Sequence, residues 1–306
     1  MDAGGCAAAM RDMAAWAAHP QGRAVAAEPL LHHEAGDPGT APRWTVPSGR
    51  PLQGVRVLDM TRVLAGPVAT RFLAGFGADV LRLDPPGWDE PAIVPGVTLG
   101  KRCARLNLRQ PGDRIIWEGL LRTADVLVHG YRPGALAGLG LDAEHRRALC
   151  PGVVDVSLDA YGWTGPWQGR RGFDSPVQMS SGIAEAGLRL RGRDRPTPLP
   201  VQALDHATGY VMAAAAVRGL TERLTMGEGC AVRPSLARTA VLLTSLPPGQ
   251  PVPFASAVVD DYAKALEATA WGPARRLRPP GSVSGATMRW DLPASALGTA
   301  AAAWAD

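Results

Sequence analysis

The sequence predicts an α/β protein organised around a doubly wound, Rossmann-like parallel sheet. Over residues 51–158, short apolar stretches alternate with helical stretches, and little length is left between them. This alternation is typical of parallel strands joined by helices that lie on both faces of a sheet. The 306 residues are enough to bury a full hydrophobic core, so we expect one large domain with smaller additions at its two ends.

The stretch 51–84 predicts one βαβ unit. Val55–Leu58 is a short apolar strand, and Pro67 stands where a helix takes its first residue. Ala69–Phe76 is helical, a glycine ends it, and Asp79–Asp84 alternates as a second strand. The turn before the helix is where such a sheet presents backbone amides to a ligand. It has neither the GxGxxG pattern of a dinucleotide site nor the GxxxxGK[ST] pattern of a P-loop, so neither nucleotide site is predicted.

The other elements of the large domain follow in order along the chain. Short apolar runs predict the strands, and longer runs with helical periodicity predict the helices. The predicted strands are Ala104–Leu108, Asp125–Val128 and Val153–Leu158, and the predicted helices are Asp113–Arg122, Ala143–Cys150 and the Ala-rich His206–Arg218. A further apolar segment, Leu236–Leu246, follows them.

Three regions are predicted on this basis. Residues 1–50 form a helical N-terminal extension, with helices over Ala7–Ala18 and near Gly22–His33, followed by a linker. Residues 51–246 form the large domain. Residues 247–306 are rich in Pro, Ala and Arg, have the weakest periodicity, and are expected to form a reduced C-terminal segment.

The composition predicts a chain without nucleic-acid, metal or membrane binding. The net charge is only +4, and the arginines are spread along the chain rather than gathered in a basic block. Cys6, Cys103, Cys150 and Cys230 have no metal-ligand spacing, so we expect no metal site and reduced thiols in the cytoplasm. There is no apolar run of about 18 residues and no basic start of a signal peptide.

Several short blocks in the large domain carry more information together than any of them carries alone. They occur in a fixed order after the βαβ unit. The blocks are Gly100-Lys101-Arg102 before Leu106-Asn107-Leu108, Ala124-Asp125-Val126 leading to Gly130-Tyr131-Arg132-Pro133-Gly134, the loop Tyr161-Gly162-Trp163-Thr164-Gly165-Pro166, and Arg171-Gly172-Phe173-Asp174 with Gln178.

In the residues and the order of these motifs, the chain resembles the family III coenzyme A transferases. These include formyl-CoA and carnitine CoA-transferases and the related α-methylacyl-CoA racemase. The resemblance runs through residues 51–246. It implies a CoA-transferase that moves coenzyme A between an acyl-CoA and a carboxylic acid, with acyl-CoA as substrate and no tightly bound cofactor.

The resemblance implies that Asp205 is the nucleophile, because the family places an aspartate between a strand and an Ala-rich helix. A carboxylate at a helix start is expected to favour its ionised form. The alternative is that Asp205 only caps the helix. Asp174 is expected to support the site, or else to pair with Arg170 or Arg171. The racemase branch has a histidine where this chain has Phe173, which disfavours racemisation because that reaction needs two acid–base groups.

For coenzyme A, the resemblance implicates two loops and a basic pair. Basic side chains pair with phosphates, and an exposed tyrosine stacks on adenine or lines the pantetheine channel. The alternatives are solvated loop charges and a packing role for the tyrosine. The implicated residues are Val63, Leu64, Ala65, Lys101, Arg102, Gly130, Tyr131 and Arg132.

The C-terminal region departs from the family pattern. Family members carry a further small domain that closes interlocked dimers, and most of it is absent or reduced between residues 247 and 306. A non-catalytic CoA-binding or structural role is therefore the main alternative function. We expect a homodimer of simpler topology, and Asp205, Asp174 and the Val63–Ala65 turn converging on one pocket. The acyl donor and acceptor are not indicated by the sequence.

Overall fold

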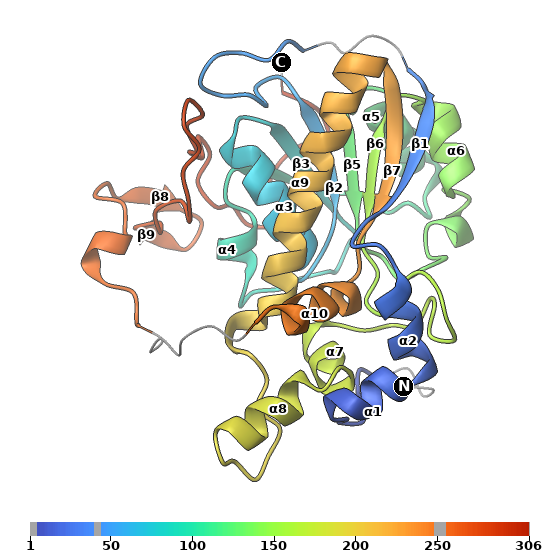
Figure 1. Ribbon diagram of the computed structural model, residues 1–306. Helices are drawn as coiled ribbons and strands as arrows, with labels where there is room; N and C mark the ends of the chain where they lie inside the picture. Colours follow the sequence, from blue (N-terminus) through green and yellow to red (C-terminus); the bar gives the residue numbers. More distant parts are fainter. Residues whose placement is uncertain (1–4, 40–43, 248–254, 306) are drawn as a thin grey trace.

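A seven-stranded sheet forms the centre of the computed structural model, which describes residues 5–39, 44–247 and 255–305 (Figure 1). The strand order is β1-β7-β6-β5-β2-β3-β4; all neighbours are parallel except β1, which pairs antiparallel with β7 at the edge. The order reverses beside β2, as in doubly wound sheets, so the predicted fold class is confirmed. The strands are β1 His32–Pro38, β2 Arg56–Met60, β3 Asp79–Asp84, β4 Lys101–Arg105, β5 Val126–His129, β6 Val154–Ser157 and β7 Glu228–Arg233.

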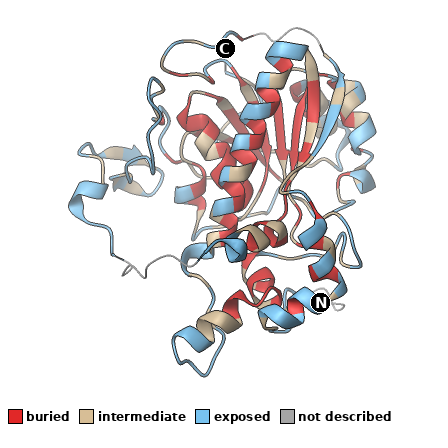
Figure 2. Cartoon of the chain, in the orientation of Figure 1, coloured by how far each residue is buried: buried red, intermediate tan, exposed pale blue. Residues whose placement is uncertain are grey.

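Helices cover both faces of this sheet. α3 (Ala65–Gly75) and the long α9 (Ala203–Met226) pack on one face, and α5 (Pro111–Leu121) and α6 (Ala143–Leu149) pack on the other. Strand alternation separates the two cores: Val126 and Val128 face α3 and α9, whereas Leu127 faces α5. Figure 2 shows the result as buried residues concentrated in the strands and on the inner faces of α3 and α9.

The predicted βαβ unit is present with small changes at its boundaries. β3 has the predicted bounds, and β2 lies one to two residues later than predicted. α3 begins at Ala65, so Pro67 is its third residue rather than its first. Gly77 follows the helix with a φ of +110°, a conformation that glycine adopts without steric cost.

Two predictions outside this unit are corrected. β4 starts at Lys101 instead of Ala104, so the basic pair that was expected in a loop lies within a strand. The N-terminal region is more than a helical extension, because His32–Pro38 forms the edge strand β1. Its polar sequence has no alternation of apolar residues, since an edge strand that is exposed on both sides requires none. At this edge the sheet therefore contains two strands that were not predicted, β1 and β7.

A layer of short helices lies at the end of the sheet where the parallel strands finish (Figure 1). Within it, the N-terminal α2 holds the loop that follows β6. Gln21 Nε2 donates to the carbonyl of Tyr161 at 2.8 Å, and Glu28 accepts from the amides of Trp163 and Thr164 at 2.8 Å each. The helices are α1 Met13–Ala18, α2 Pro20–Ala27, α7 Asp174–Ser180, α8 Ile183–Leu190 and α10 Leu236–Ser245.

The C-terminal segment has two different parts. A small hairpin, β8 (Glu267–Thr269) and β9 (Gly272–Ala274), stands apart from the sheet in Figure 1. The last residues return to β4, where the amide of Ala300 donates to the carbonyl of Cys103 at 2.9 Å. Among the described residues, no helix is both long and apolar enough to cross a membrane. The remaining elements are α4 Val94–Val97 and the short 3-10 helices Ala137–Leu139, Pro200–Gln202 and Val259–Asp261.

Candidate functional site

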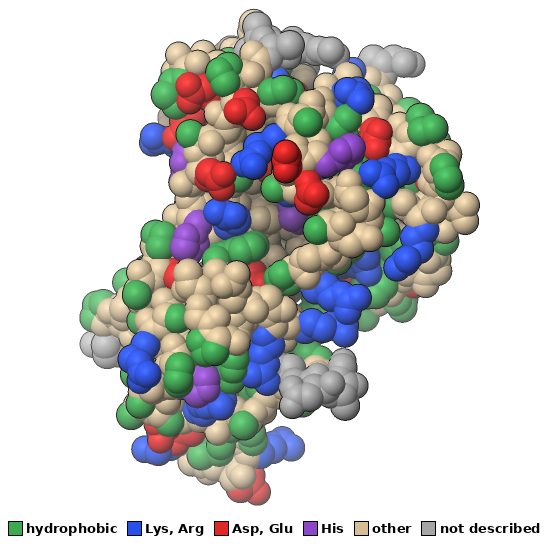
Figure 3. Space-filling model, turned by 90° about the vertical axis from the view of Figure 1, so that its right-hand side faces the viewer, with side chains coloured by type: hydrophobic (Ala, Val, Ile, Leu, Met, Phe, Trp, Pro, Cys, Tyr) green, Lys and Arg blue, Asp and Glu red, His purple; other side chains and the backbone are tan. Residues whose placement is uncertain are grey.

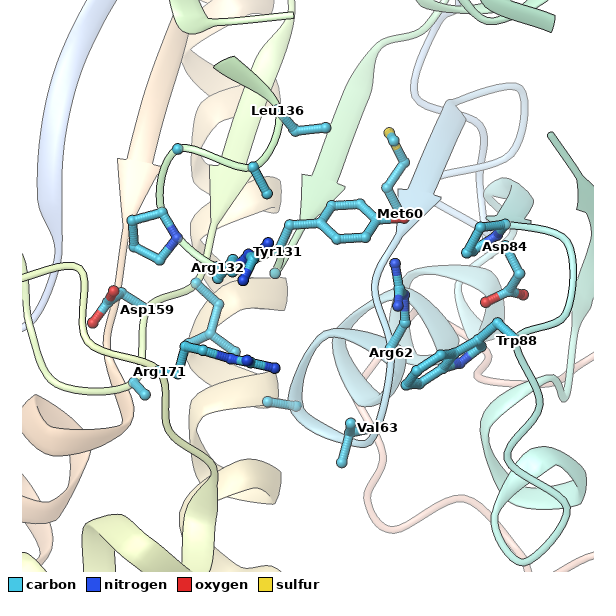
Figure 4. A pocket seen from close by; sticks show the side chains of 18 of the residues that line it. Met60, Arg62, Val63, Asp84, Trp88, Tyr131, Arg132, Leu136, Asp159 and Arg171 are labelled. Carbon is cyan, nitrogen blue, oxygen red and sulfur yellow. The ribbon is translucent and has the colours of Figure 1, made fainter. Parts of the chain in front are cut away.

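A pocket of about 1070 Å³ opens at the carboxyl ends of the strands (Figure 4). This is the position at which open α/β sheets bind their ligands, because the loops from several strands meet there. The turn after β2, the loop after β5, the loop after β6 and the first turn of α9 all contribute to its wall. The predicted residues that line it are Val63, Leu64, Ala65, Gly130, Tyr131, Arg132 and Asp205.

Asp205 is the acidic group contributed by α9. It is the third residue of the helix, and only 6% of it is exposed. Burial, and then the nearby charge of Asp174, raise the pKa of Asp205 to about 7. The expectation that the helix start favours the ionised form is therefore wrong. A helix terminus contributes about 0.3–1 kcal/mol at exposed positions, which is too little to offset the loss of solvent around a buried carboxylate.

The backbone around the site is strained at specific residues. Val201 and Gln202, which come directly before α9, have φ values of 58° and 54°, and Val63 in the turn after β2 has a φ of 62°. In the described part of the chain these are the only non-glycine residues with positive φ. Such a conformation costs on the order of 1–3 kcal/mol per residue and is found mostly at functional sites. The strain therefore coincides with the two segments that bring Val63 and Asp205 to the pocket.

Asp174 lies behind the pocket wall rather than in it. It is the first residue of α7 and is 1% exposed. Its Oδ2 accepts from the backbone amide of Asp205 at 3.0 Å, and its Oδ1 accepts from Gln178 Nε2. These contacts replace the alternative pairing with Arg170 or Arg171. Asp174 therefore holds the first turn of α9 through its backbone.

Tyr131 belongs to an aromatic group at the opposite wall. The guanidinium carbon of Arg62 lies 4.3 Å from the ring centroid of Trp88 and 4.5 Å from that of Tyr131. Figure 4 shows all three side chains around the same cavity. Cation–π contacts of this kind hold the guanidinium in place at the pocket wall.

Lys101 and Arg102 are placed away from the pocket. The Lys101 side chain is fully buried beneath α3, and its Nζ donates to Asp59 Oδ2 at 2.9 Å and to Thr70 Oγ1 at 2.6 Å. Arg102 points to the other face of β4 and forms two bonds with Asp79, at 2.7 and 2.8 Å. The expected contact of this basic pair with a ligand phosphate is not supported. The sequence pattern could not reveal this, because the partner of Lys101 comes from β2.

The pocket contains functional groups that sequence reasoning missed. Asp159 is 3% exposed; burial raises its pKa to about 7, and the charge of Glu28 adds to this, although the amides of Tyr161 and Gly162 donate to it. Several arginines make the wall electropositive, which suits an anionic ligand. Arg171 was visible in the sequence only as part of a block. The arginines are Arg132, which was predicted, together with Arg62, Arg109, Arg170 and Arg171.

Comparison with known proteins identifies the family. The profile of CoA-transferase family III matches residues 52–259. Succinyl-CoA:glutarate CoA-transferase of Mus musculus is 34% identical over 204 residues, which cover 61% of this chain and 46% of the relative. The probable fatty acyl-CoA transferase Rv3272 of Mycobacterium tuberculosis is 31% identical over 206 residues, with coverages of 63% and 52%.

The fold agrees with this similarity. The crystal structure of Rv3272 superimposes with a TM-score of 0.60 at 31% sequence identity, over 65% of this chain and 57% of that chain. The chain spans about half the length of the curated relatives it matches. The family profile covers more than half of the chain, and residues of several of the motifs, among them Gly130, Arg132 and Phe173, line one pocket at the end of the sheet. The chain therefore belongs to CoA-transferase family III.

Proposed function

We propose that this protein transfers coenzyme A between an acyl-CoA and a carboxylic acid, with Asp205 as the nucleophile. The observation that carries the proposal is the buried carboxylate of Asp205 in the wall of a large electropositive pocket. Relatives named as CoA-transferases support it. Acyl-CoA and a carboxylic acid are the substrates, and the reaction requires no tightly bound cofactor.

The proposed reaction is an exchange of acyl groups on one carboxylate. Ionised Asp205 attacks the thioester carbonyl, the C–S bond breaks, and a mixed anhydride forms with release of the CoA thiolate. The thiolate attacks the Asp205 carbonyl, which gives an aspartyl-CoA thioester and the free donor acid. The acceptor carboxylate then repeats both steps in reverse order and leaves as the new acyl-CoA. Electron pairs balance throughout, and no oxidant is consumed.

The surrounding residues have distinct proposed roles. Asp174 holds the first turn of α9 by accepting the Asp205 amide, so that the nucleophile keeps its position. The Val63–Ala65 turn and the Gly130–Arg132 loop line the path of coenzyme A. The raised pKa makes Asp205 a stronger base and a stronger nucleophile once it is ionised. Lys101 and Arg102 are not part of this proposal, because neither lines the pocket.

The proposal is tested by trapping the intermediate. The protein is incubated with succinyl-CoA and hydroxylamine, which cleaves aspartyl anhydrides and thioesters and leaves a hydroxamate. Intact mass followed by peptide mapping should locate one hydroxamate on Asp205. The Asp205→Asn variant is the matched negative control, and Asp194→Asn, at an exposed position, is the control for general reactivity. A wild-type protein that binds the thioester without modification would overturn the proposal.

That outcome would favour the second candidate, a CoA-binding member without catalysis. It is considered because the chain spans about half the length of its relatives. A racemase is disfavoured because Phe173, which lines the pocket, has no titratable group.

We also propose that the protein is a homodimer that functions in the cytoplasm. The outward face of α9 exposes an apolar stripe of Tyr210, Val217 and Leu224, spaced seven residues apart, which suits packing against a second copy. The four cysteines all lie in described segments and none forms a disulfide, which suits a reducing compartment. Light scattering at micromolar concentration should give twice the chain mass, and a mass of 32.1 kDa would contradict the dimer.

A further inference from the structure

A group of metal-ligating side chains lies at the edge of the sheet, outside the pocket. Here β1 pairs with β7, and α9 packs on β7 and reaches β1 through the contact between Glu222 and His33. Figure 3 shows acidic, basic and histidine side chains gathered on this side of the molecule. Asp205 and Glu222 are both on α9, and 17 residues of helix correspond to about 25 Å along its axis, so this region is remote from the proposed nucleophile.

Three different donor atoms meet at this edge. His33 of β1, Glu222 of α9 and Cys230 of β7 each offer one ligand atom, and the three atoms all lie within 4.8 Å of one another. His33 Nε2 and Glu222 Oε2 are 2.8 Å apart. An imidazole nitrogen, a carboxylate oxygen and a thiol sulfur are the three donor types that Zn²⁺ accepts in proteins.

The fold brings these residues together by identifiable steps. Alternation along β1 directs His33 toward α9, while the next residue, Glu34, pairs with Arg147 and Arg233 instead. The Cys230 thiol reaches α9 because Gly219 has no side chain: a Cβ at Gly219 would lie 2.6 Å from Cys230 Sγ. Glu222 is one helical turn further along the same face of α9.

The carboxylate of Glu222 is already oriented. Arg218 Nε donates to its Oε1 at 2.6 Å, which leaves Oε2 directed toward His33. Metal-binding carboxylates commonly have such an outer partner, which fixes the ligand orientation. The His33 side chain is 40% exposed, so an ion has access from solvent.

We propose that His33, Glu222 and Cys230 bind one divalent transition-metal ion of the zinc class, with water as the fourth ligand. Binding converts the Cys230 thiol to a thiolate, and the released proton goes to solvent. The ion links the edge strand β1 to β7 and α9. It therefore fastens the N-terminal region to the large domain and is independent of the proposed acyl transfer.

The experiment uses Co²⁺ as a spectroscopic substitute for Zn²⁺. The full-length protein is freed of metal with a chelator and titrated with Co²⁺. We expect one equivalent to give the thiolate-to-cobalt charge-transfer band together with the strong visible bands of a four-coordinate ion. Zn²⁺ should displace the Co²⁺ and raise the thermal unfolding midpoint. A chain that retains no ion at one equivalent would overturn the proposal.

Variants identify the ligands. Loss of a residue that orients a metal ligand lowers the metal affinity about 10–100-fold, so Arg218→Ala should weaken binding about tenfold. Loss of a ligand itself should cost more, so His33→Asn and Glu222→Gln should each weaken binding at least about 100-fold. Cys230→Ser should lose the charge-transfer band. Circular dichroism checks that the variant at the buried Cys230 folds. If it does not fold, Glu222→Gln still tests the site, because Glu222 is partly exposed.

The control variant is Cys6→Ser, which removes an exposed thiol elsewhere in the chain. It should keep the band and the affinity of the wild type. If the band is lost with Cys6→Ser and kept with Cys230→Ser, the ion is held by a surface thiol and the proposed site is wrong.

Discussion

Two buried aspartates on the same side of the sheet have opposite surroundings. Asp59, in β2, is fully buried and contacts the Lys101 ammonium and the hydroxyls of Thr61 and Thr70. Asp205, in α9, is almost as buried but faces the pocket, and its nearest charged influence is another carboxylate, Asp174. Both carboxylates are buried, so what distinguishes them is the neighbouring charge: Asp59 contacts a cation, whereas Asp205 lies near a second carboxylate.

The consequence appears in their protonation. Burial would raise the pKa of Asp59, but Lys101 and Arg82 lower it below its ordinary value. Without such a cation, burial and Asp174 raise the pKa of Asp205 to about 7. A buried carboxylate next to a cation is a fixed structural charge. A buried carboxylate without one exchanges protons near neutral pH and retains its basicity for chemistry.

The largest expected effect is the loss of activity at Asp205. Asp205→Asn keeps the shape of the side chain but removes the attacking oxygen charge. Acyl transfer from succinyl-CoA should fall at least about 10³-fold, as expected when a covalent nucleophile is lost. Steady-state kinetics measure the change, with Asp194→Asn expected to match the wild type. Activity within tenfold of the wild type would remove Asp205 from the mechanism.

The second effect is a loss of folding stability when the buried Asp59 loses its partner Lys101. Lys101→Met leaves Asp59 buried without its cation, which should lower the free energy of unfolding by about 3–5 kcal/mol. Urea denaturation measures this. The double variant Asp59→Asn with Lys101→Met should recover part of the loss, because no unpaired charge remains. A single variant as stable as the wild type would show that Lys101 is not needed to hold Asp59.

The third effect is the pH dependence that Asp205 contributes, which the comparison with Asp205→Asn separates from that of other buried groups such as Asp159. Its pKa is about 7 in the folded protein, against 3.8 for an ordinary aspartate, so the folded state binds a proton more tightly than the unfolded chain. The stabilisation is complete below pH 4 and is lost as the pH rises to 7. Compared with Asp205→Asn, the wild type should lose on the order of 3 kcal/mol of unfolding free energy between pH 4 and 8. Urea titrations of both proteins at several pH values provide the measurement, and parallel curves would contradict the raised pKa.

The smallest effect is expected at Arg102, next to Lys101 in sequence. Its ion pair with Asp79 is about one quarter exposed, so Arg102→Ala should cost less than about 1 kcal/mol of unfolding free energy. The KM for acyl-CoA should stay close to that of the wild type, because Arg102 does not line the pocket. A large rise in KM would restore Arg102 to the ligand site and would show that the protein rearranges on binding.

Local sequence patterns predicted most of the sheet and part of the site. The β2–α3–β3 unit was recognisable because apolar alternation and helical periodicity are local properties. The Val63–Ala65 turn, the Gly130–Arg132 loop and Asp205 were predicted from motifs, and the structure brings them to one pocket. β1 was missed because a polar edge strand has no alternation of apolar residues and is defined by its pairing with β7, which lies almost 200 residues later.

The sequence by itself determined the fold class, the order of most strands and helices between β2 and β6, and the family to which the chain belongs. These depend on periodicity, turn residues and short motifs, which act over a few residues. Only the tertiary structure decided which charges have partners: Lys101 pairs with Asp59, His33 lies close to Cys230, and Asp205 has no paired cation among the residues that the structure describes. The reason is that the pKa of a buried group and the ligands around an ion depend on neighbours in space, and those neighbours come from strands and helices far apart in the chain.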